Sequence, residues 1–429
     1  MPSGPPPGPR PSADPRGAET AGGATPLRIA FFTDSFVPTH DGVAQVTDTL
    51  ARALVRLGHE VTVHTVRPPG APSREARPDG VRIRRHASFA APRYPQYRIA
   101  PLPWVAPASL RRRFEVAHIH TPGLVGLAGL LAARKARVPT VGTYHTNLTD
   151  MLRGAGRTRV SRAFFRAWGA FSLDLCQGCD LATAPTEAAA AALRRPGRTA
   201  GRSAPRVVVN GVDTGVFRPG RLIPRWSERL GSKDAPLITF LGRLTRDKGA
   251  ARFLDAIERL RTDRPWFAVV AGEGPLGSSV EGRLAPGRPL ASRARYVGAV
   301  TEEEKPSLLS QSRVFVLPSL SDTSSVALLE AMASGAACVV TRWGGPAELA
   351  ARSQAALVVD PQDPGDLGDA IERLLEDDDL VASFRERGRT WVEQHASAAT
   401  MARQFVEAYQ SVRRPRVDRE RDPSPEQRP

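Results

Sequence analysis

The sequence has 429 residues, of which 41% are hydrophobic. This length exceeds what one hydrophobic core usually supports, so two domains are expected. The formal net charge is +16 and comes mainly from arginine, which favours anionic partners such as phosphorylated substrates or acidic lipid headgroups. A solvated surface with basic tails explains the charge equally well. Because the arginines are scattered, without a zinc-finger, RNA-binding or basic-zipper pattern, the sequence argues against a nucleic-acid partner.

Cysteines and apolar stretches indicate the compartment. Cys176, Cys179 and Cys338 cannot all pair, and no second pair completes a zinc or redox motif, so we predict packing cysteines in a reducing cytoplasm. The longest apolar stretch, residues 124–133, is far shorter than the ~20 residues that cross a bilayer. Residues 1–26 contain no apolar segment like that of a signal peptide, and their composition predicts a disordered tail.

Short β-rich runs alternate with longer helical patterns, which predicts an α/β fold with parallel sheets. In the first half we expect, in chain order, strand 28–32, helix 45–57, strand 60–66, strand 116–120, helix 122–136, strand 140–144, strand 181–184 and strand 206–209. Residues 217–236 are rich in proline and arginine and have weak periodicity, so we interpret them as a hinge.

The second half repeats the alternation. We expect strand 237–241, helix 250–260, strand 266–271, strand 295–297, helix 308–311, strand 314–317, helix 326–333, strand 337–341, and helices at 366–376, 380–393 and 396–412. Thr301 and Glu304 match a capping box, although Pro306 is expected to strain or shorten the helix that follows.

This order of elements predicts the domains. We place an N-terminal Rossmann-like domain at 27–218, a C-terminal Rossmann-like domain at 219–395, a further helix at 396–412 and a disordered tail at 413–429. Two doubly wound halves bind a ligand in the cleft between them, at the carboxyl ends of their strands.

The run SLSDTSSVALLEAM, residues 319–332, carries the clearest functional signal. It follows a β-rich run that ends in proline, and its second part has helical composition, so Asp322 is expected in a loop and Glu330 farther along a helix. The start of that helix offers backbone N–H groups between the two acids. Such donors suit phosphate and carboxylates suit sugar hydroxyls, which indicates a ligand that carries both, such as a nucleotide sugar.

The run GRLTRDKG, residues 242–249, leaves the expected strand 237–241. Its Arg243 and Lys248 can converge on a diphosphate, the first as a planar fork and the second as a point charge. An ordinary surface loop is the alternative. The residue order is not that of a Walker loop, so magnesium-dependent chemistry of the kinase type is not expected.

Three other expected strand ends carry candidate ligand contacts. Gly42 would let the backbone approach a phosphate where a helix opens, His145 stands where a side chain can touch a ligand, and Glu273 lies between two glycines. Each has an ordinary alternative, namely a loop glycine, a hydrogen-bonded structural histidine and a tight turn.

No metal site is expected. His118 and His120 share one expected strand, and we expect their rings to face opposite sides, so that they would not hold a metal together. The acidic run 377–379 follows a helix and is interpreted as solvated. No serine-hydrolase elbow, HExxH helix or GxGxxG fingerprint occurs in the right context, which argues against hydrolases, metalloproteases and dehydrogenases.

In chain order, these motifs resemble those of family 4 of the retaining glycosyltransferases over about residues 27–412. The shared pieces are the first loop at 34–42, TYHT at 143–146, NGVD at 210–213 with FRP at 217–219, GRLTRDKG at 242–249, GEGP at 272–275 and the acid pair. The resemblance implies the GT-B fold, in which two Rossmann-like domains face each other across a cleft. It also implies that the helix 396–412 crosses back to the N-terminal domain.

The same resemblance implies roles for individual residues. Arg243 and Lys248 would hold the donor diphosphate, Glu330 the nucleotide ribose and Asp322 the donor sugar, beside His145 at the reacting centre. The implied catalytic residues are His145 and Asp322, and the implied donor-binding residues are Gly42, Arg243, Lys248, Glu273, Ser324, Ser325, Val326 and Glu330. No metal or other cofactor is implied, and the reaction would retain the anomeric configuration.

The sequence departs from the family pattern in its best-defined motif. The usual first glutamate is Asp322, one methylene shorter, and the usual aromatic–glycine pair is Ser324-Ser325. Because serine lacks the freedom of glycine at positive φ, the backbone there is expected to adopt an ordinary conformation or to be strained. In the first loop, Asp41-Gly42 replaces the paired glycines that the family often has.

We therefore hypothesise an enzyme that moves a hexose, with mannose from GDP-mannose as the first choice, to a hydroxyl of a lipid or glycan. The alternatives are a UDP-sugar-dependent glucosyl- or N-acetylglucosaminyltransferase and a non-catalytic sugar-nucleotide or glycan-binding protein of the same fold. Basic residues at 93–98 and 111–113 suggest peripheral contact with an anionic membrane at its inner face, with surface or core-anchoring arginines as the alternative.

Overall fold

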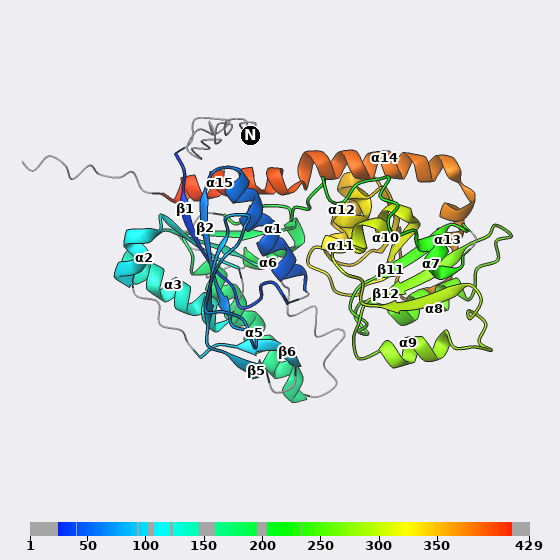
Figure 1. The fold of residues 1–429 in the computed structure, drawn as a ribbon, viewed down its shortest axis with the longest axis horizontal. Coiled ribbons are helices and arrows are strands. Elements are labelled where there is room, and N and C mark those ends of the chain that lie inside the picture. Colours follow the sequence, from blue (N-terminus) through cyan, green and yellow to red (C-terminus); the bar gives the residue numbers. More distant parts are fainter. Residues whose placement is uncertain are drawn as a thin grey trace, which may run out of the picture.

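The computed structural model describes residues 25–39, 41–91, 94–101, 107–120, 123–145, 159–194, 204–232 and 234–413. Most of the two expected tails, 1–26 and 413–429, lies outside these residues, as does Thr146 of the TYHT motif. The described chain forms two large sheets with helices on their faces (Figure 1). No described helix combines the length and hydrophobicity needed to cross a membrane.

The described part of the first half holds an eight-stranded sheet in the order β10-β9-β8-β7-β1-β2-β4-β3, in which all neighbours are parallel except β3 and β4. Its strands are β1 (Arg28–Phe32), β2 (Glu60–Val66), β3 (Arg74–Ala76), β4 (Arg82–His86), β7 (Val116–Ile119), β8 (Thr140–Thr143), β9 (Leu181–Ala184) and β10 (Arg206–Val207). A separate hairpin pairs β5 (Phe89–Ala91) with β6 (Tyr94–Ile99). Apolar runs such as β1 are buried because helices cover both faces of a parallel sheet.

Two aspartates of the first half accept hydrogen bonds from the N-termini of helices around this sheet. The helices are α1 (Gly42–Arg56), α2 (Pro107–Arg113), α3 (Leu124–Ala136), α5 (Arg159–Gln177) and α6 (Glu187–Leu193). Helix α1 begins at Gly42 instead of residue 45 because the Asp41 carboxylate accepts the N–H of Ala44 at 2.9 Å. Asp34, at the end of β1, accepts the N–H of Val125 at 3.0 Å and so fixes the start of α3.

The second half holds a parallel, six-stranded sheet, within the described residues, in the order β13-β12-β11-β14-β15-β16. Its strands are β11 (Leu237–Leu241), β12 (Phe267–Ala271), β13 (Ala294–Gly298), β14 (Ser312–Leu317), β15 (Ala337–Thr341) and β16 (Ala356–Val359). When the six strands are numbered in chain order, their order in the sheet is 3-2-1-4-5-6, which is the Rossmann order. The switch point of this order lies between β11 and β14. Ligands bind such sheets at the carboxyl ends of the strands beside the switch point.

The helices of the second half are α7 (Trp226–Leu230), α8 (Ala250–Ile257), α9 (Gly277–Arg283), α10 (Lys305–Gln311), α11 (Val326–Ala333), α12 (Gly345–Ser353) and α13 (Pro364–Glu376). The capping box forms before α10, where Thr301 and Glu304 exchange hydrogen bonds of 3.2 Å. Pro306 does not strain α10 as expected from the sequence. It stands in the first turn of the helix, where an N–H has no helical partner in any case.

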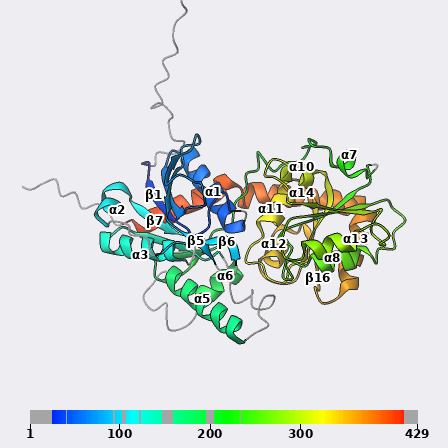
Figure 2. The same ribbon diagram turned by 60° about the horizontal axis from the view of Figure 1, so that its bottom comes forward.

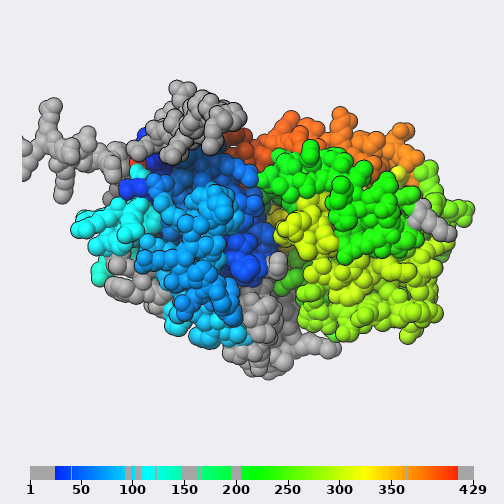
Figure 3. Space-filling view, in the orientation of Figure 1, coloured from blue at the N-terminus to red at the C-terminus, as the bar shows by residue number. Residues whose placement is uncertain are grey.

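Two C-terminal helices join the halves. Helix α14 (Asp378–His395) packs on α11 of the second half and α15 (Ala398–Val412) packs on α1 of the first, as two views show (Figures 1 and 2). Where the chain crosses, Ala398 N–H donates to the carbonyl of Val212 at 2.8 Å. One hydrophobic cluster runs from β1 and α1 through α15 to α11 and β15. In the space-filling view, the halves touch along a seam (Figure 3).

Candidate active site

Loops of the second half form one layer at the carboxyl edge of its sheet. They follow β11, β12, β14 and β15, so they include the runs GRLTRDKG and GEGP and Asp322, the first acid of the pair. Backbone hydrogen bonds connect them: Leu244 N–H donates to the carbonyl of Glu273 at 2.8 Å, Leu320 N–H to that of Asp247 at 2.7 Å and Gly345 N–H to that of Asp322 at 2.9 Å. Residues that are 23 to 73 positions apart in the sequence thus lie side by side at the switch point, as the expected fold requires.

Glycines let these loops approach one another. A Cβ on Gly272 would lie 1.9 Å from the carbonyl oxygen of Gly242, and one on Gly249 would lie 2.2 Å from that of Pro318. Both glycines also have positive φ, 129° and 82°. Gly345 has an ordinary φ, but a Cβ there would lie 2.1 Å from the carbonyl oxygen of Thr323, next to Asp322. The close packing of these loops therefore requires glycine at these three positions.

The serine pair that replaces the family's usual residues is not strained. Neither Ser324 nor Ser325 has a positive φ, and Ser325 caps α11 by accepting the N–H of Leu328 at 3.3 Å. The Ser324 hydroxyl oxygen is buried and has no hydrogen-bond partner among the described residues. The first turn of α11 thus has backbone N–H groups without helical partners, and the unpaired Ser324 hydroxyl lies just before its cap.

The first turn of α1 faces the first turn of α11. A methyl group on Gly42 would lie 3.9 Å from Cγ2 of Val326, and both ribbon views place α1 and α11 on facing sides of the two halves (Figures 1 and 2). A helix N-terminus carries positive partial charge, equivalent to about half an elementary charge. The first turns of α1 and α11 thus meet at van der Waals distance, and the uncapped N–H groups of both ends, beside the Asp41 cap of α1, favour an anion next to them.

Lys248 and Asp322 pair with each other inside the loop layer. The Lys248 Nζ lies 2.8 Å from Asp322 Oδ2, and the two side chains are 18% and 14% exposed. Arg243, on the same loop as Lys248, and Glu273, on the loop after β12, are exposed. The structure therefore brings the expected diphosphate lysine and the expected sugar-binding acid into direct contact.

Glu330 lies on α11, as expected, but deeper than the other site residues. Its carboxylate Oε1 is 2.9 Å from Lys305 Nζ, and both side chains are 6% exposed. Burial raises the pKa of Glu330, against the opposing effect of the Lys305 ammonium. Burial lowers the pKa of Lys305, but the carboxylates of Glu330 and Glu302 outweigh it and raise the pKa overall.

His145 stands at the end of β8, in the first half. It is partly buried, its Nε2 lies 3.1 Å from Nδ1 of His120, and burial lowers its pKa to about 4. The expectation that His118 and His120 face opposite sides of the sheet is wrong, because their ring centroids are 3.7 Å apart. Residues two apart on a strand point to the same face. Within the described chain, no group of three or more histidines, cysteines or acids is placed to hold a metal ion.

Two family models match this chain, each over one half. The model described as Glycosyltransferase Family 4 matches residues 40–216, and the model described as Glycosyl transferases group 1 matches residues 223–391. The chain belongs to glycosyltransferase family 4. The resemblance inferred from the motifs is thereby confirmed.

Individual relatives and solved structures agree with this family. A GDP-mannose-dependent alpha-mannosyltransferase of Mycobacterium tuberculosis is 28% identical over 378 residues, 85% of this chain and 93% of the relative. Sucrose-phosphate synthase from Thermosynechococcus elongatus superposes with a TM-score of 0.71 at 21% identity, over 89% of this chain and 98% of that one. Anabaena HepE in complex with UDP-glucose gives a TM-score of 0.67 at 18% identity, over 90% and 100%. The GT-B fold class is confirmed.

The motifs did not reveal the residues through which the two halves of this glycosyltransferase touch beside the loop 318–325 that carries Asp322. Thr186 Oγ1 donates to the carbonyl of Thr323 at 3.1 Å. The Glu348 carboxylate of α12 accepts the N–H groups of Glu187 and Ala188, at 2.9 and 3.1 Å, and so caps α6 in the opposite half. Thr186 is recognisable in the sequence as an N-cap residue, but its partner in the other half is not. Each of these contacts joins residues more than 130 positions apart.

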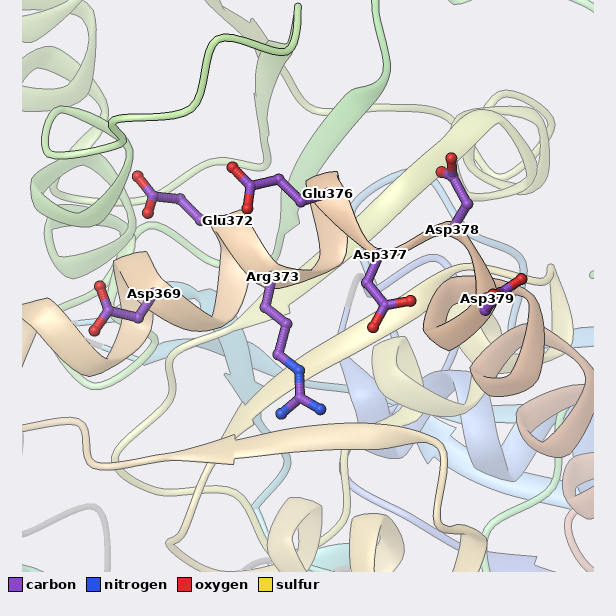
Figure 4. A pocket seen from close by; sticks show the side chains of 7 residues that line it. All are labelled: Asp369, Glu372, Arg373, Glu376, Asp377, Asp378 and Asp379. Carbon is purple, nitrogen blue, oxygen red and sulfur yellow. The ribbon is translucent and has the colours of Figure 1, made fainter.

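Two hollows of the described surface lie away from these loops. One, of about 670 Å³, is lined by six acids and Arg373 of α13 and the start of α14 (Figure 4), where Asp378 pairs with Arg264 and Arg313. The other, of about 770 Å³, includes five arginines at the amino ends of β1, β7 and β8. Helices α2, α3, α5 and α15 end there, so these arginines neutralise helix C-termini. Neither hollow contains an expected site residue.

Replacing Gly345 with alanine is expected to disturb the loop that carries Asp322 and Thr323. The added Cβ must displace the Thr323 carbonyl, and overpacking of this kind costs about 1–3 kcal/mol. We expect a lower melting temperature and weaker binding of a nucleoside diphosphate, measured by calorimetry. Gly282→Ala is the matched control, because a Cβ there, in α9, meets no atom within 4 Å. Unchanged nucleotide binding in Gly345→Ala would show that this loop does not shape the donor site.

Proposed function

We propose that this glycosyltransferase is a retaining, metal-independent hexosyltransferase that moves mannose from GDP-mannose to a hydroxyl of a lipid or glycan. One observation carries the proposal: the first turns of α1 and α11 meet where Gly42 lies against Val326, and Asp322, three residues before the Ser325 cap of α11, pairs with Lys248. Helix N–H groups and a lysine suit a diphosphate, and an adjacent carboxylate suits the hydroxyls of a sugar.

Lys248 and Asp322 exchange partners when the donor binds. Without the donor, each neutralises the other at 2.8 Å. The diphosphate attracts the ammonium more strongly than one carboxylate does, because it carries more charge and lies at a helix N-terminus. Asp322 then accepts a hydrogen bond from a sugar hydroxyl. Arg243, on the same loop as Lys248, supplies a second cation to the diphosphate.

The reaction breaks the bond between the anomeric carbon and the diphosphate oxygen and forms a bond to the acceptor oxygen on the same face. The proton of the acceptor hydroxyl passes to the departing diphosphate. Negative charge that develops on the diphosphate is stabilised by Lys248, Arg243 and the N–H groups of α1 and α11, which are in place before the reaction. These groups supply the charge stabilisation that a metal ion provides in other transferases, so no metal is required.

Replacing His145 with glutamine is expected to lower kcat about tenfold to a hundredfold and to leave the donor KM within about twofold of wild type, since a residue beside the reacting sugar acts mainly in the transition state. Steady-state kinetics with saturating acceptor measure both. Because its pKa is about 4, His145 is neutral above about pH 5 and is expected to add no inflection to kcat between pH 6 and 8. His395→Gln, at an exposed position of α14, is the matched control. A raised KM with unchanged kcat would remove His145 from the reacting centre.

The donor is tested by incubating the purified protein with GDP- and UDP-sugars and following nucleotide release, with and without EDTA. Release of GDP from GDP-mannose, unaffected by EDTA and stimulated by a lipid or glycan acceptor, is the expected result. The similarity to a GDP-mannose-dependent mannosyltransferase favours this donor. Turnover of UDP-glucose or UDP-N-acetylglucosamine instead would identify the second candidate, which the likeness to HepE in complex with UDP-glucose favours. A rise in melting temperature without release, across an acceptor panel, would identify a non-catalytic binder.

The proposed acceptor places the enzyme at the inner face of the membrane, where it contacts anionic lipid from the cytoplasm. Arg111, Arg112 and Arg113 end α2 and are exposed. In the other basic segment, 93–98, most side chains lie outside the described structure, and Arg98 donates to the carbonyl of Ser88 at 2.6 Å. Each exposed arginine near an anionic surface contributes about 1 kcal/mol. Sedimentation with vesicles that contain acidic lipid, compared with neutral vesicles, tests this contact.

A further inference from the structure

Lys305 is a buried cation that the family motifs do not explain. It opens α10, its side chain is 6% exposed, and its Nζ lies 2.9 Å from Glu330 Oε1 and 3.0 Å from Glu302 Oε2. The ammonium also stands 5.3 Å from the ring centroid of Phe217, in the segment that connects the halves. One lysine thus joins the expected ribose-binding acid, a second acid and the interdomain connection.

The second acid extends this contact to the opposite half. Glu302 Oε1 accepts a hydrogen bond of 3.0 Å from Nε2 of Gln45. Gln45 is in the first turn of α1, three residues after Gly42, whose backbone faces α11. A chain of polar contacts therefore runs from Glu330 through Lys305 and Glu302 to the phosphate-facing end of α1.

We propose that Lys305 is a positioning residue for donor binding: it keeps Glu330 ionised and oriented towards the donor ribose, and through Glu302 and Gln45 it ties that subsite to α1 of the opposite half. The proposal rests on the proposed function for the assignment of the ribose to Glu330. The pairing uses Oε1 of Glu330, so we expect Oε2 to accept the ribose hydroxyl.

Charge explains why Glu330 needs this lysine. An isolated carboxylate as deeply buried as Glu330 would take up a proton and lose acceptor capacity, because burial disfavours its charged form. Two charges act on it, the Lys305 ammonium, which favours ionisation, and the Glu302 carboxylate, which opposes it. Of the elements packed against α11, α14 brings Arg389, which donates to the Ala333 carbonyl, and β15 brings the neutral thiol of Cys338. Strand β14 brings Arg313, which donates to the Leu374 carbonyl and pairs with Asp378. Lys305 is thus the favourable charge that Glu330 depends on.

Lys305→Met and Glu302→Gln are expected to change the affinity for GDP at low pH in opposite directions. Lys305→Met removes the favourable charge and raises the pKa of Glu330, so GDP binding weakens at low pH and recovers as the pH rises. Glu302→Gln removes the opposing charge and lowers that pKa, so GDP binding at low pH stays equal to wild type or improves. Each unit by which the Glu330 pKa exceeds the pH corresponds to about a tenfold loss of the ionised form.

The experiment titrates GDP calorimetrically into wild type, Lys305→Met, Lys305→Arg and Glu302→Gln between pH 5.5 and 8.5. We expect Lys305→Met to bind about tenfold or more weakly at pH 5.5, with the ratio to wild type narrowing as the pH rises, and Lys305→Arg to restore binding. Lys135→Met, at an exposed position of α3, controls for loss of a lysine. A ratio that is independent of pH, or the same sign for Lys305→Met and Glu302→Gln, would overturn the proposal.

Thermal stability gives a second readout that needs no ligand. In Lys305→Met the folded state holds a proton on Glu330 that the unfolded state releases, so stability relative to wild type falls as the pH rises. This direction is opposite to that of GDP binding, which separates the electrostatic effect from general misfolding. If wild type binds neither GDP nor UDP, the proposed function fails, while this stability profile still decides whether Lys305 keeps Glu330 ionised.

The link to the opposite half is tested by a double-mutant cycle. Gln45→Ala breaks only the contact to Glu302, so its effect on GDP affinity should be smaller in the Lys305→Met background than in wild type. Equal effects in both backgrounds would show that α1 and Glu330 are independent, and would remove the interdomain part of the proposal.

Discussion

Lys248→Met is expected to lower kcat/KM for the nucleotide-sugar donor by about 10²–10³, the usual loss when one preorganised group that stabilises developing charge is removed. Two effects add. The diphosphate loses its point charge, and Asp322 loses the partner that lies 2.8 Å from it in a site where both side chains are largely buried. Steady-state kinetics over a range of donor concentrations measure the loss of kcat/KM. Calorimetry with GDP measures how much of that loss is already present in ground-state binding.

Lys135→Met is the matched control for this variant, because Lys135 is also a lysine but is exposed near the end of α3, in the other half. Lys248→Arg keeps the charge and changes its shape, so it should recover part of the GDP affinity. If Lys248→Met bound GDP as tightly as wild type, the diphosphate would not lie at this loop and the donor assignment would be wrong.

Local patterns were sufficient to predict the positions of the acid pair. The strand before it and the helix after it have strong and different compositions, so Asp322 falls in the loop and Glu330 in α11, whose observed bounds, Val326–Ala333, match those expected. The same alternation predicted the parallel sheets. It missed short elements such as β3, β5, α7 and α9, because three to seven residues carry too little periodicity to stand out.

Side-chain partners could not be predicted in the same way. Lys305 reaches Glu330, and Glu348 caps α6, across separations that only tertiary packing sets. A lysine in a charged run such as EEEK is typical of a solvated surface, and nothing local indicates that α10 and α11 bury it. The pairing of Lys248 with Asp322 was missed for another reason, since the family resemblance describes these residues with a donor present.

The histidines of the first half are expected to make the fold sensitive to acid. Burial lowers the pKa of His145 to about 4 and that of His64 to about 3, and it places those of His118 and His120 well below 6.5. Between pH 6.5 and those values, the unfolded chain binds protons that the folded chain excludes. The free energy of unfolding therefore falls as the pH falls, by about 1.4 kcal/mol per pH unit for each such histidine.

Urea unfolding between pH 7.5 and 5 measures this slope, and His64→Phe separates the histidine contribution from that of the carboxylates. His64 stacks on Phe32 with centroids 4.7 Å apart, and its Nε2 is buried without a described partner, so a phenyl ring keeps the stacking contact. The substitution also removes the 3.2 Å hydrogen bond between His64 Nδ1 and His86 Nε2, so the slope of stability with pH is compared and not the absolute stability. We expect a shallower loss of stability with acid in His64→Phe and an unchanged slope in His395→Phe, whose side chain is exposed. Equal slopes in wild type and His64→Phe would mean that His64 takes up its proton in the folded state.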